Sequence, residues 1–371
     1  MRIAQITLYS LPIEVGMELT RYVASQAIDP ALDVLVVKIE TDGGLIGWGE
    51  VCSAPPYYLP ELSAGAREGI CHVSPLVLGR DPRQVAAIIR DINAALRGHG
   101  NAKTALEMAL WDLAAKAQGL PLIDLWGGRI NESLPVLNVV RIGSREEMLA
   151  QFEAQRAQGY ARFQIKVGAG EPQADIETIR MVQEMALPHE RLWYDPNRAW
   201  LVDDAIRVIT ATAESAPMIE NPCETYEECR TVAQKTGCRI MLDEVLDSPQ
   251  RFLQAAQDQV LDVASIKTSC IGGIEATRTT MSLATVLGVP LRIEDYYGTG
   301  LLFACVTHMA HSLPEALVFG LYDFVSEDLP LVLNPLQVVD GRVGLPADCG
   351  PGLGVEVNET LLGKPVAELT A

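Results

Sequence analysis

Five charged residues in this chain each close a short apolar run, and they recur at the length of one strand and helix. They are Lys166, Asp195, Glu220, Asp243 and Lys267, separated by 29, 25, 23 and 24 residues. Short apolar runs that alternate with amphipathic helices are typical of βαβ units and a parallel sheet. Successive strands of such a sheet deliver their terminal residues to one edge, so the spacing predicts that these five side chains share one opening.

The count of candidate strands favours a closed barrel over an open sheet. Eight apolar runs follow one another at about 25-residue spacing, as expected for a TIM-type (β/α) barrel. We predict strands near residues 135–140, 162–167, 192–195, 218–220, 240–243, 263–267, 291–294 and 317–320.

The two ends of the chain do not follow this rhythm. Residues 33–39 and 44–48 are predicted to be strands joined by a glycine-containing turn, and residues 80–119 have helical apolar spacing that ends at Gly119. We therefore expect an N-terminal α+β capping domain over residues 1–128 and a catalytic barrel over residues 129–324. The segment 325–371, rich in turn residues, is predicted to return to the capping domain.

The charged strand ends indicate metal chemistry. Asp195, Glu220 and Asp243 would repel one another at one opening unless a cation lay between them, and oxygen ligands favour Mg²⁺. The global charge of −19 adds no positive field, so an anionic substrate must be attracted by this metal and by lysines. A bound Mg²⁺ keeps positions open for a substrate carboxylate.

Lys166 and Lys267 would flank such a substrate. They come from the second and sixth predicted strands, on opposite sides of an eight-stranded barrel. A lysine can act as a base when its pKa is lowered by a nearby dication, and a metal makes the proton alpha to a carboxylate removable by stabilising the enediolate. We predict Mg²⁺-dependent abstraction of that proton from a small-molecule carboxylate.

Several longer motifs resemble the mandelate racemase/muconate lactonizing enzyme family of the enolase superfamily. They lie at residues 102–107, 111–113, 125–128 and 267–273, and the resemblance covers nearly the whole chain. It implies that Asp195, Glu220 and Asp243 bind Mg²⁺, that Lys166 and Lys267 form the acid/base pair of the muconate lactonizing subgroup, and that the protein is a homo-oligomer. One position departs from the subgroup, which usually has Lys-x-Lys on the second strand; here the first lysine is Gln164, which could instead bind the substrate carboxylate.

The predicted mouth of the barrel carries aromatic and acidic residues that suit a cationic amine. Tyr58, Asp295 and Tyr322 have a layout similar to members of the superfamily that act on hydroxyproline betaine, and these also carry Gln-x-Lys. We favour a racemase or epimerase of an amino acid or proline betaine, with specificity loops near residues 15–29 and 51–61. Dehydration of a 3-hydroxyproline-like acid, cycloisomerisation of a muconate and a non-catalytic barrel remain alternatives.

Other residues receive smaller roles. Asn197 shares a strand face with Asp195 and is a candidate contact to the substrate or to a ligand, as is Glu244 beside Asp243. His308 and His311 are predicted to pack or cap rather than bind metal.

Composition excludes some classes of partner. The net negative charge argues against nucleic acid as a partner. The sequence lacks an apolar stretch long enough to predict a membrane-spanning helix. Its eight cysteines include no CxxC pair, which suggests a reducing, cytoplasmic location.

Overall fold

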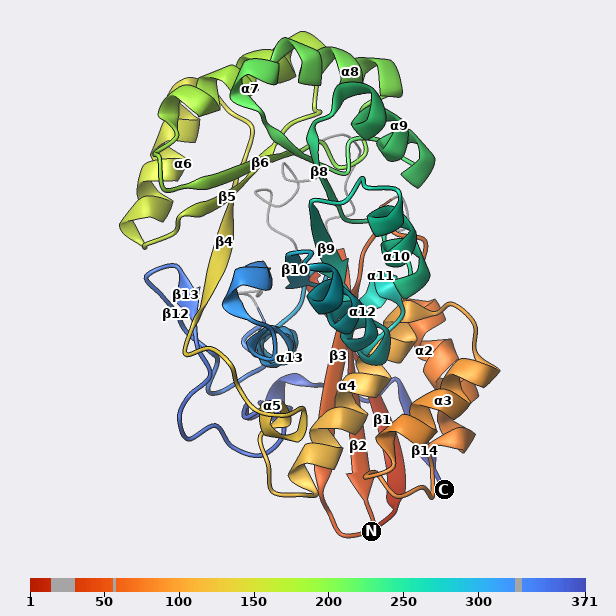
Figure 1. The fold of residues 1–371 in the computed structure, drawn as a ribbon. Coiled ribbons are helices and arrows are strands. Elements are labelled where there is room, and N and C mark those ends of the chain that lie inside the picture. Colours follow the sequence, from red (N-terminus) through yellow and green to blue (C-terminus); the bar gives the residue numbers. More distant parts are fainter. Residues whose placement is uncertain (15–30, 56–57, 324–328) are drawn as a thin grey trace.

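The computed structural model describes residues 1–14, 31–55, 58–323 and 329–371. A four-stranded antiparallel sheet in the order β14-β1-β2-β3 forms the centre of the capping domain, and both chain ends lie beside it (Figure 1). Its strands are β1 (Ile3–Glu14), β2 (Ala31–Thr41), β3 (Ile46–Ser53) and β14 (Ala367–Thr370).

Helices cover one face of this sheet. They are α2 (Ser63–Val73), α3 (Val85–Ala95) and α4 (Gly100–Lys116), and the short α5 (Leu122–Leu125) packs against α4. Helix α4 lies so close to β3 that a Cβ on Gly49 would overlap the carbonyl of Ala105. Glycine on β3 therefore permits the contact, and α4 is buried along most of its length, with Leu106 and Leu110 in the core of the capping domain.

The second domain is a closed parallel barrel, and the predicted TIM-type fold is confirmed. Strands β4 to β11 pair in sequence, and β11 pairs with β4 to close the ring. The strands are β4 (Leu134–Val140), β5 (Arg162–Lys166), β6 (Arg191–Asp195), β7 (Met218–Glu220), β8 (Arg239–Leu242), β9 (Val263–Lys267), β10 (Leu291–Glu294) and β11 (Val318–Tyr322).

Helices on the outside of the barrel connect these strands (Figure 1). They are α6 (Arg145–Ala157), α7 (Pro172–Met185), α8 (Val202–Ala211), α9 (Tyr226–Thr236), α10 (Pro249–Gln257), α11 (Thr268–Ile271), α12 (Ile274–Leu287) and α13 (Gly300–His311). Local sequence sets several of their starts. Ser144 and Thr225 each form a capping box with a glutamate three residues later, which satisfies free N–H groups at the helix end.

The barrel interior has an apolar floor and a charged mouth. Trp193, Met218, Met241, Val263 and Phe319 pack together inside the lower part. Side chains alternate along each strand, so the residues two positions further on also point inward. Those positions are Asp195 and Glu220, the last residues of β6 and β7, and Asp243, which directly follows β8. The three predicted metal ligands therefore lie at the C-terminal end of the barrel.

Buried polar contacts fix the capping domain over that end. The Glu50 carboxylate on β3 accepts hydrogen bonds from Thr299 N (2.7 Å), Thr299 Oγ1 (2.7 Å) and Leu302 N (2.9 Å) at the start of α13. His308 on α13 accepts from Ile123 N at 3.2 Å through Nδ1. Its ring is buried, which lowers the pKa of His308 to about 4, so the expected packing role holds for this histidine.

The C-terminal segment contributes to both domains. Strand β14 pairs with β1, whereas the hairpin β12 (Val338–Val339) and β13 (Arg342–Val343) pairs with β4 of the barrel. No helix within the described ranges is long and apolar enough to span a membrane. The proposed specificity loop at residues 15–29 lies outside the described residues, as do residues 56 and 57 of the second loop.

Candidate active site

The five predicted residues lie at the C-terminal ends of consecutive strands, and Asp243 directly follows β8. All five are buried, with relative exposures of 5% or less. Strands β5 and β9, which carry the two lysines, are separated by three strands on either side of the ring. The lysines therefore face the carboxylates from opposite walls.

Lys166 contacts the first carboxylate. Its Nζ donates to Asp195 Oδ2 at 2.6 Å and to Asn197 Oδ1 at 2.8 Å. Asn197 has a positive φ of 46°, and its backbone N–H donates to Asp195 Oδ1 at 2.8 Å. The tight turn after β6 thus folds Asn197 back over the strand end and sets the position of both the carboxylate and the lysine.

Lys267 lies between two carboxylates. It forms a close ion pair with Asp243 and another with Glu294 Oε1 at 3.1 Å. Burial alone would lower the pKa of Lys267, but Asp243 and Glu294 outweigh this and raise it. Glu294, the last residue of β10, was not among the predicted site residues.

Glu220 is held by an arginine that the sequence analysis also missed. Arg292 on β10 donates to both Glu220 oxygens, at 2.5 and 2.9 Å, and Trp193 Nε1 donates to Oε2 at 2.7 Å. Gln164 Nε2 reaches the same Oε2 at 2.7 Å and Asp195 Oδ2 at 3.0 Å. Gln164 therefore contacts two predicted metal ligands.

Tyr58 from the capping domain completes the mouth. Its hydroxyl donates to Glu244 Oε1 at 2.5 Å, and Asn197 Nδ2 donates to the same oxygen at 3.3 Å. The Tyr58 ring lies 5.4 Å from that of Tyr296 and 6.0 Å from Lys267 Nζ. Glu244 thereby links the capping domain to the segment that holds Lys166.

Two predicted substrate contacts occupy different surroundings. The buried Asp295 carboxylate accepts hydrogen bonds from Thr268 Oγ1, Ser269 N, Ser269 Oγ and Tyr296 N, so it fixes the turn that follows Lys267. Tyr322 ends β11 and packs against the apolar cluster inside the barrel. The structure thus brings Tyr58 near Lys267, and it gives Asp295 a place in the supporting turn.

Burial and mutual repulsion govern the pKa values of the predicted metal ligands. Burial, followed by the charge of Glu220, raises the pKa of Asp195. Burial also raises the pKa of Asp243. Glu220 shows the opposite result, because Arg292 outweighs burial and lowers its pKa to about 2.

The donor set fits a hard divalent cation in its chemistry. Five buried carboxylates face three buried cations, a formal excess of two negative charges; the carboxylates are Asp195, Glu220, Asp243, Glu244 and Glu294, and the cations are Lys166, Lys267 and Arg292. Asp243 Oδ1 is buried and has no hydrogen-bond partner among the described residues. Within the described residues no three acidic, histidine or cysteine side chains converge as a ready ligand cluster, because the carboxylates are turned toward these cations. Asp195, Glu220 and Asp243 would hold Mg²⁺ by exchanging some of these contacts for the ion.

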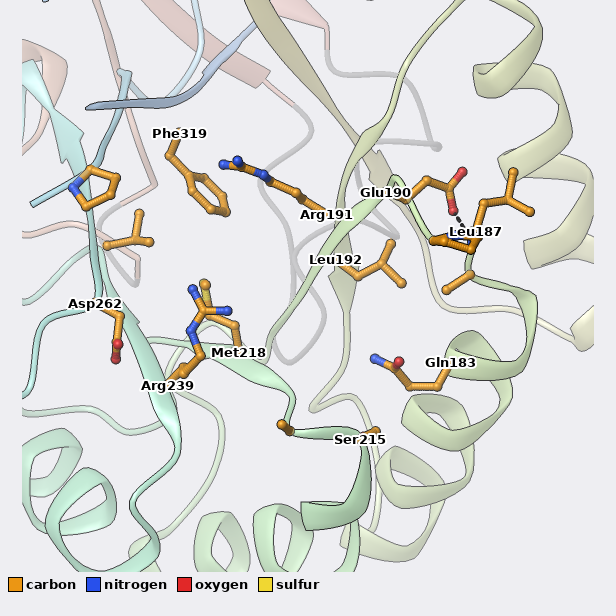
Figure 2. Close-up of a pocket in the computed structure, with 15 residues that line it drawn as sticks. Gln183, Leu187, Glu190, Arg191, Leu192, Ser215, Met218, Arg239, Asp262 and Phe319 are labelled. Atoms are coloured by element: carbon orange, nitrogen blue, oxygen red, sulfur yellow. Dashed lines mark hydrogen bonds between the residues drawn. The ribbon is translucent and has the colours of Figure 1, made fainter. Parts of the chain in front are cut away.

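A cavity of about 750 Å³ adjoins the mouth. It is lined by capping-domain residues near Glu61 and Asn101 and by barrel residues that include Glu244 and Cys270. Figure 2 shows a different pocket, of about 660 Å³, around Arg191, Arg239 and Phe319. Strands β6 and β8 begin at Arg191 and Arg239, so this pocket lies at the N-terminal end of the barrel, away from the predicted chemistry.

Comparison with known proteins agrees with this geometry. Residues 16–127 match the mandelate racemase/muconate lactonizing enzyme N-terminal domain, and residues 147–361 match the enolase C-terminal domain-like family. The chain belongs to the mandelate racemase/muconate lactonizing enzyme family of the enolase superfamily. Membership of this family supports Mg²⁺-dependent proton abstraction as its general chemistry, and the resemblance drawn from the sequence motifs is confirmed.

Individual relatives differ in the reaction that their names give. The chain is 34% identical over 336 residues to cis-3-hydroxy-L-proline dehydratase of Roseibium aggregatum, covering 90% of this chain and 91% of the relative. It is 29% identical to L-Ala-D/L-Glu epimerase of Bacillus subtilis, covering 86% and 88%. A solved enolase-superfamily member from Roseovarius nubinhibens, complexed with magnesium, superposes with a TM-score of 0.92 at 32% identity, covering 100% of both chains.

Proposed function

We propose that this protein removes the proton alpha to the carboxylate of a cyclic, hydroxylated amino acid and dehydrates it. The observation that carries the proposal is the placement of Lys166 and Lys267 on opposite walls of the barrel, with three carboxylates on the strands between them. When bound there, Mg²⁺ would stabilise the enediolate that forms when the proton leaves. The chain's own residues then carry the proton transfers.

One lysine acts as the base and the other as the acid. The base takes the alpha proton, and the C–H electron pair enters the enediolate. As the enediolate collapses, the bond from the beta carbon to its hydroxyl breaks, and the second lysine protonates the leaving oxygen to give water. Lys267 suits the acid role, because Asp243 and Glu294 hold its ammonium group between them.

The relative from Roseibium aggregatum supports dehydration over the epimerisation favoured from sequence. Its name gives the substrate as cis-3-hydroxy-L-proline, and its identity to this chain extends over 90% of the sequence. Tyr58 and the adjoining Tyr296 present aromatic faces near Lys267, which suit the cationic amine of such a substrate.

Incubation with cis-3-hydroxy-L-proline and Mg²⁺ tests this function. The enamine product would tautomerise to a cyclic imine, which is detected by its reaction with an aromatic aldehyde and by proton NMR. Lys166→Ala and Lys267→Ala are each expected to lower turnover by about 10² to 10⁴. Absence of both imine formation and alpha-proton exchange in deuterated buffer would contradict the proposal.

Epimerisation is a second candidate, and the opposed lysines favour it because each could serve one face of the substrate. The Bacillus subtilis relative is named as an epimerase. Proline betaine lacks a beta hydroxyl, so it isolates this reaction from dehydration. An epimerase would invert it in deuterated buffer, and each lysine variant would lose exchange from one enantiomer only.

A further inference from the structure

Arg292 is a fully buried cation inside the barrel, with 1% of its surface exposed. Its guanidinium donates to Glu220 Oε1 and Oε2, to Glu294 Oε1 at 2.9 Å and to Ser265 Oγ at 2.9 Å. Burying such a charge costs several kcal/mol unless its hydrogen bonds are satisfied, and here carboxylates on both sides satisfy them. The arginine therefore joins a predicted metal ligand on β7 to the carboxylate that holds Lys267.

The two oxygens of Glu220 are used unequally. Oε2 accepts from Arg292, Trp193 and Gln164, whereas Arg292 is the one donor to Oε1 among the hydrogen bonds found in the described residues. A carboxylate oxygen offers about two lone-pair sites, so Oε2 is saturated and Oε1 retains one. The bidentate arginine thus fixes which Glu220 oxygen is left for a cation.

The position that would usually carry a second lysine on β5 reaches this same carboxylate. Gln164 and Arg292 both donate to Glu220 Oε2, one from β5 and the other from β10. A lysine at position 164 would bring a fourth cation to the mouth and reduce the excess negative charge from two to one. A single excess charge is less suited to a divalent ion.

We propose that Arg292 is a positioning residue that places a positive charge beside the Glu220 carboxylate. Arg292 supplies this charge from β10, where a lysine at position 164 would supply it from β5. It holds Glu220 in place for Mg²⁺, so that position 164 can carry a neutral amide in place of a lysine. The inference rests on the proposed function only in treating Glu220 as a metal ligand, and it concerns binding rather than turnover.

This role predicts that positions 164 and 292 depend on each other in a way that a purely structural arginine would not. Arg292→Met raises the excess negative charge from two to three, but it removes the two hydrogen bonds that hold the Glu220 carboxylate. Because Glu220 then loses its fixed position, we expect Mg²⁺ binding to weaken about tenfold or more. Gln164→Lys alone adds surplus positive charge beside Arg292 and is also expected to weaken binding about tenfold. The double variant restores three cations and should bind Mg²⁺ within about threefold of the wild-type protein.

Isothermal titration of the full chain with MgCl₂ measures these affinities, and thermal unfolding with and without Mg²⁺ checks that each variant folds. Arg156→Met is the matched control. Two nitrogens of Arg156 donate hydrogen bonds to the Glu190 carboxylate, at 2.6 and 2.9 Å, far from the mouth of the barrel. This control should lose stability and keep its Mg²⁺ affinity. Arg292→Lys keeps the charge without the two-pronged contact and should fall between wild type and Arg292→Met.

Restored binding in the double variant supports the proposal. Recovery of folding by Gln164→Lys supports it as well, if Arg292→Met fails to fold. The proposal would be overturned if Gln164→Lys weakened Mg²⁺ binding equally in the wild-type protein and in Arg292→Met. It would also be overturned if Arg292→Met bound Mg²⁺ with wild-type affinity, or if the wild-type protein did not bind Mg²⁺. These readouts involve no substrate, so the proposed dehydration can fail while this inference holds.

Discussion

The hydrogen bond between Tyr58 and Glu244 offers a direct test of how the capping domain organises the active site. Tyr58→Phe removes only the hydroxyl and keeps the ring, which packs 5.4 Å from that of Tyr296. A hydrogen bond to a charged acceptor contributes about 1.5 to 3 kcal/mol. After its loss, Glu244 Oε1 retains the Asn197 amide at 3.3 Å, and Oε2 is already buried with no hydrogen-bond partner in the part of the chain that the structure describes. We therefore expect a loss of about 2 kcal/mol in stability.

The same change should affect activity. The contact between the capping domain and the barrel would lose about 2 kcal/mol of its free energy. A smaller fraction of molecules would then have an ordered active-site mouth, and we expect kcat/KM to decrease about ten- to thirtyfold. The assays are thermal unfolding and alpha-proton exchange with cis-3-hydroxy-L-proline. Tyr226→Phe is the control, because Tyr226 also donates to a carboxylate, Asp258 at 2.7 Å, on the outside of the barrel. Wild-type activity in Tyr58→Phe, or an equal loss in Tyr226→Phe, would refute the reasoning.

Three further perturbations test other parts of the structure. Gly100→Ala would place a Cβ against the carbonyl of Ser269, two residues after Lys267. We expect this to destabilise the protein by about 1 to 3 kcal/mol and to lower kcat in the exchange assay. Gly170→Ala is the control, because a Cβ at Gly170 would meet open space. Burial raises the pKa of Glu107 to about 8 from 4.5. Between these values the unfolded chain loses the Glu107 proton more readily than the folded protein, so the stability of the fold should decrease as pH rises. Glu107→Gln should reduce the decrease in melting temperature between pH 5 and 8. Removing divalent metal with EDTA should lower the melting temperature, and Mg²⁺ but not Na⁺ at equal ionic strength should restore it, because carboxylates outnumber cations at the mouth.

Much of the barrel could be predicted from the sequence because its strands are short apolar runs that end in charges. The predicted strand at 263–267 coincides with β9, and the one at 240–243 is displaced by a single residue from β8. Such runs mark buried strands well, since both faces of a parallel sheet are covered. Eight such units in succession then predict a closed ring, and they predict the end of the barrel at which Lys166 and Lys267 lie.

Strand β10 shows where that approach failed. Arg292 and Glu294 alternate with Leu291 and Ile293, and alternation on a barrel strand places two residues inside and two outside. The apolar pair predicts the strand, whereas the charged pair between them gives no signal of its own in the sequence. Asp295, the next residue, is predicted as a substrate contact because an acidic group among aromatic residues suits a cationic amine, yet its carboxylate supports the turn after Lys267.

The relation between Gln164 and Arg292 could not be found from spacing at all. The two residues are 128 positions apart on strands that are not neighbours, and both donate to Glu220 on a third strand. Closure of the ring brings the inward positions near the C-terminal ends of all eight strands around one mouth, so a charge lost on one strand can be replaced from another. A missing lysine in the Lys-x-Lys motif is therefore weak evidence for lost chemistry until the inward residues of the opposite strands have been counted.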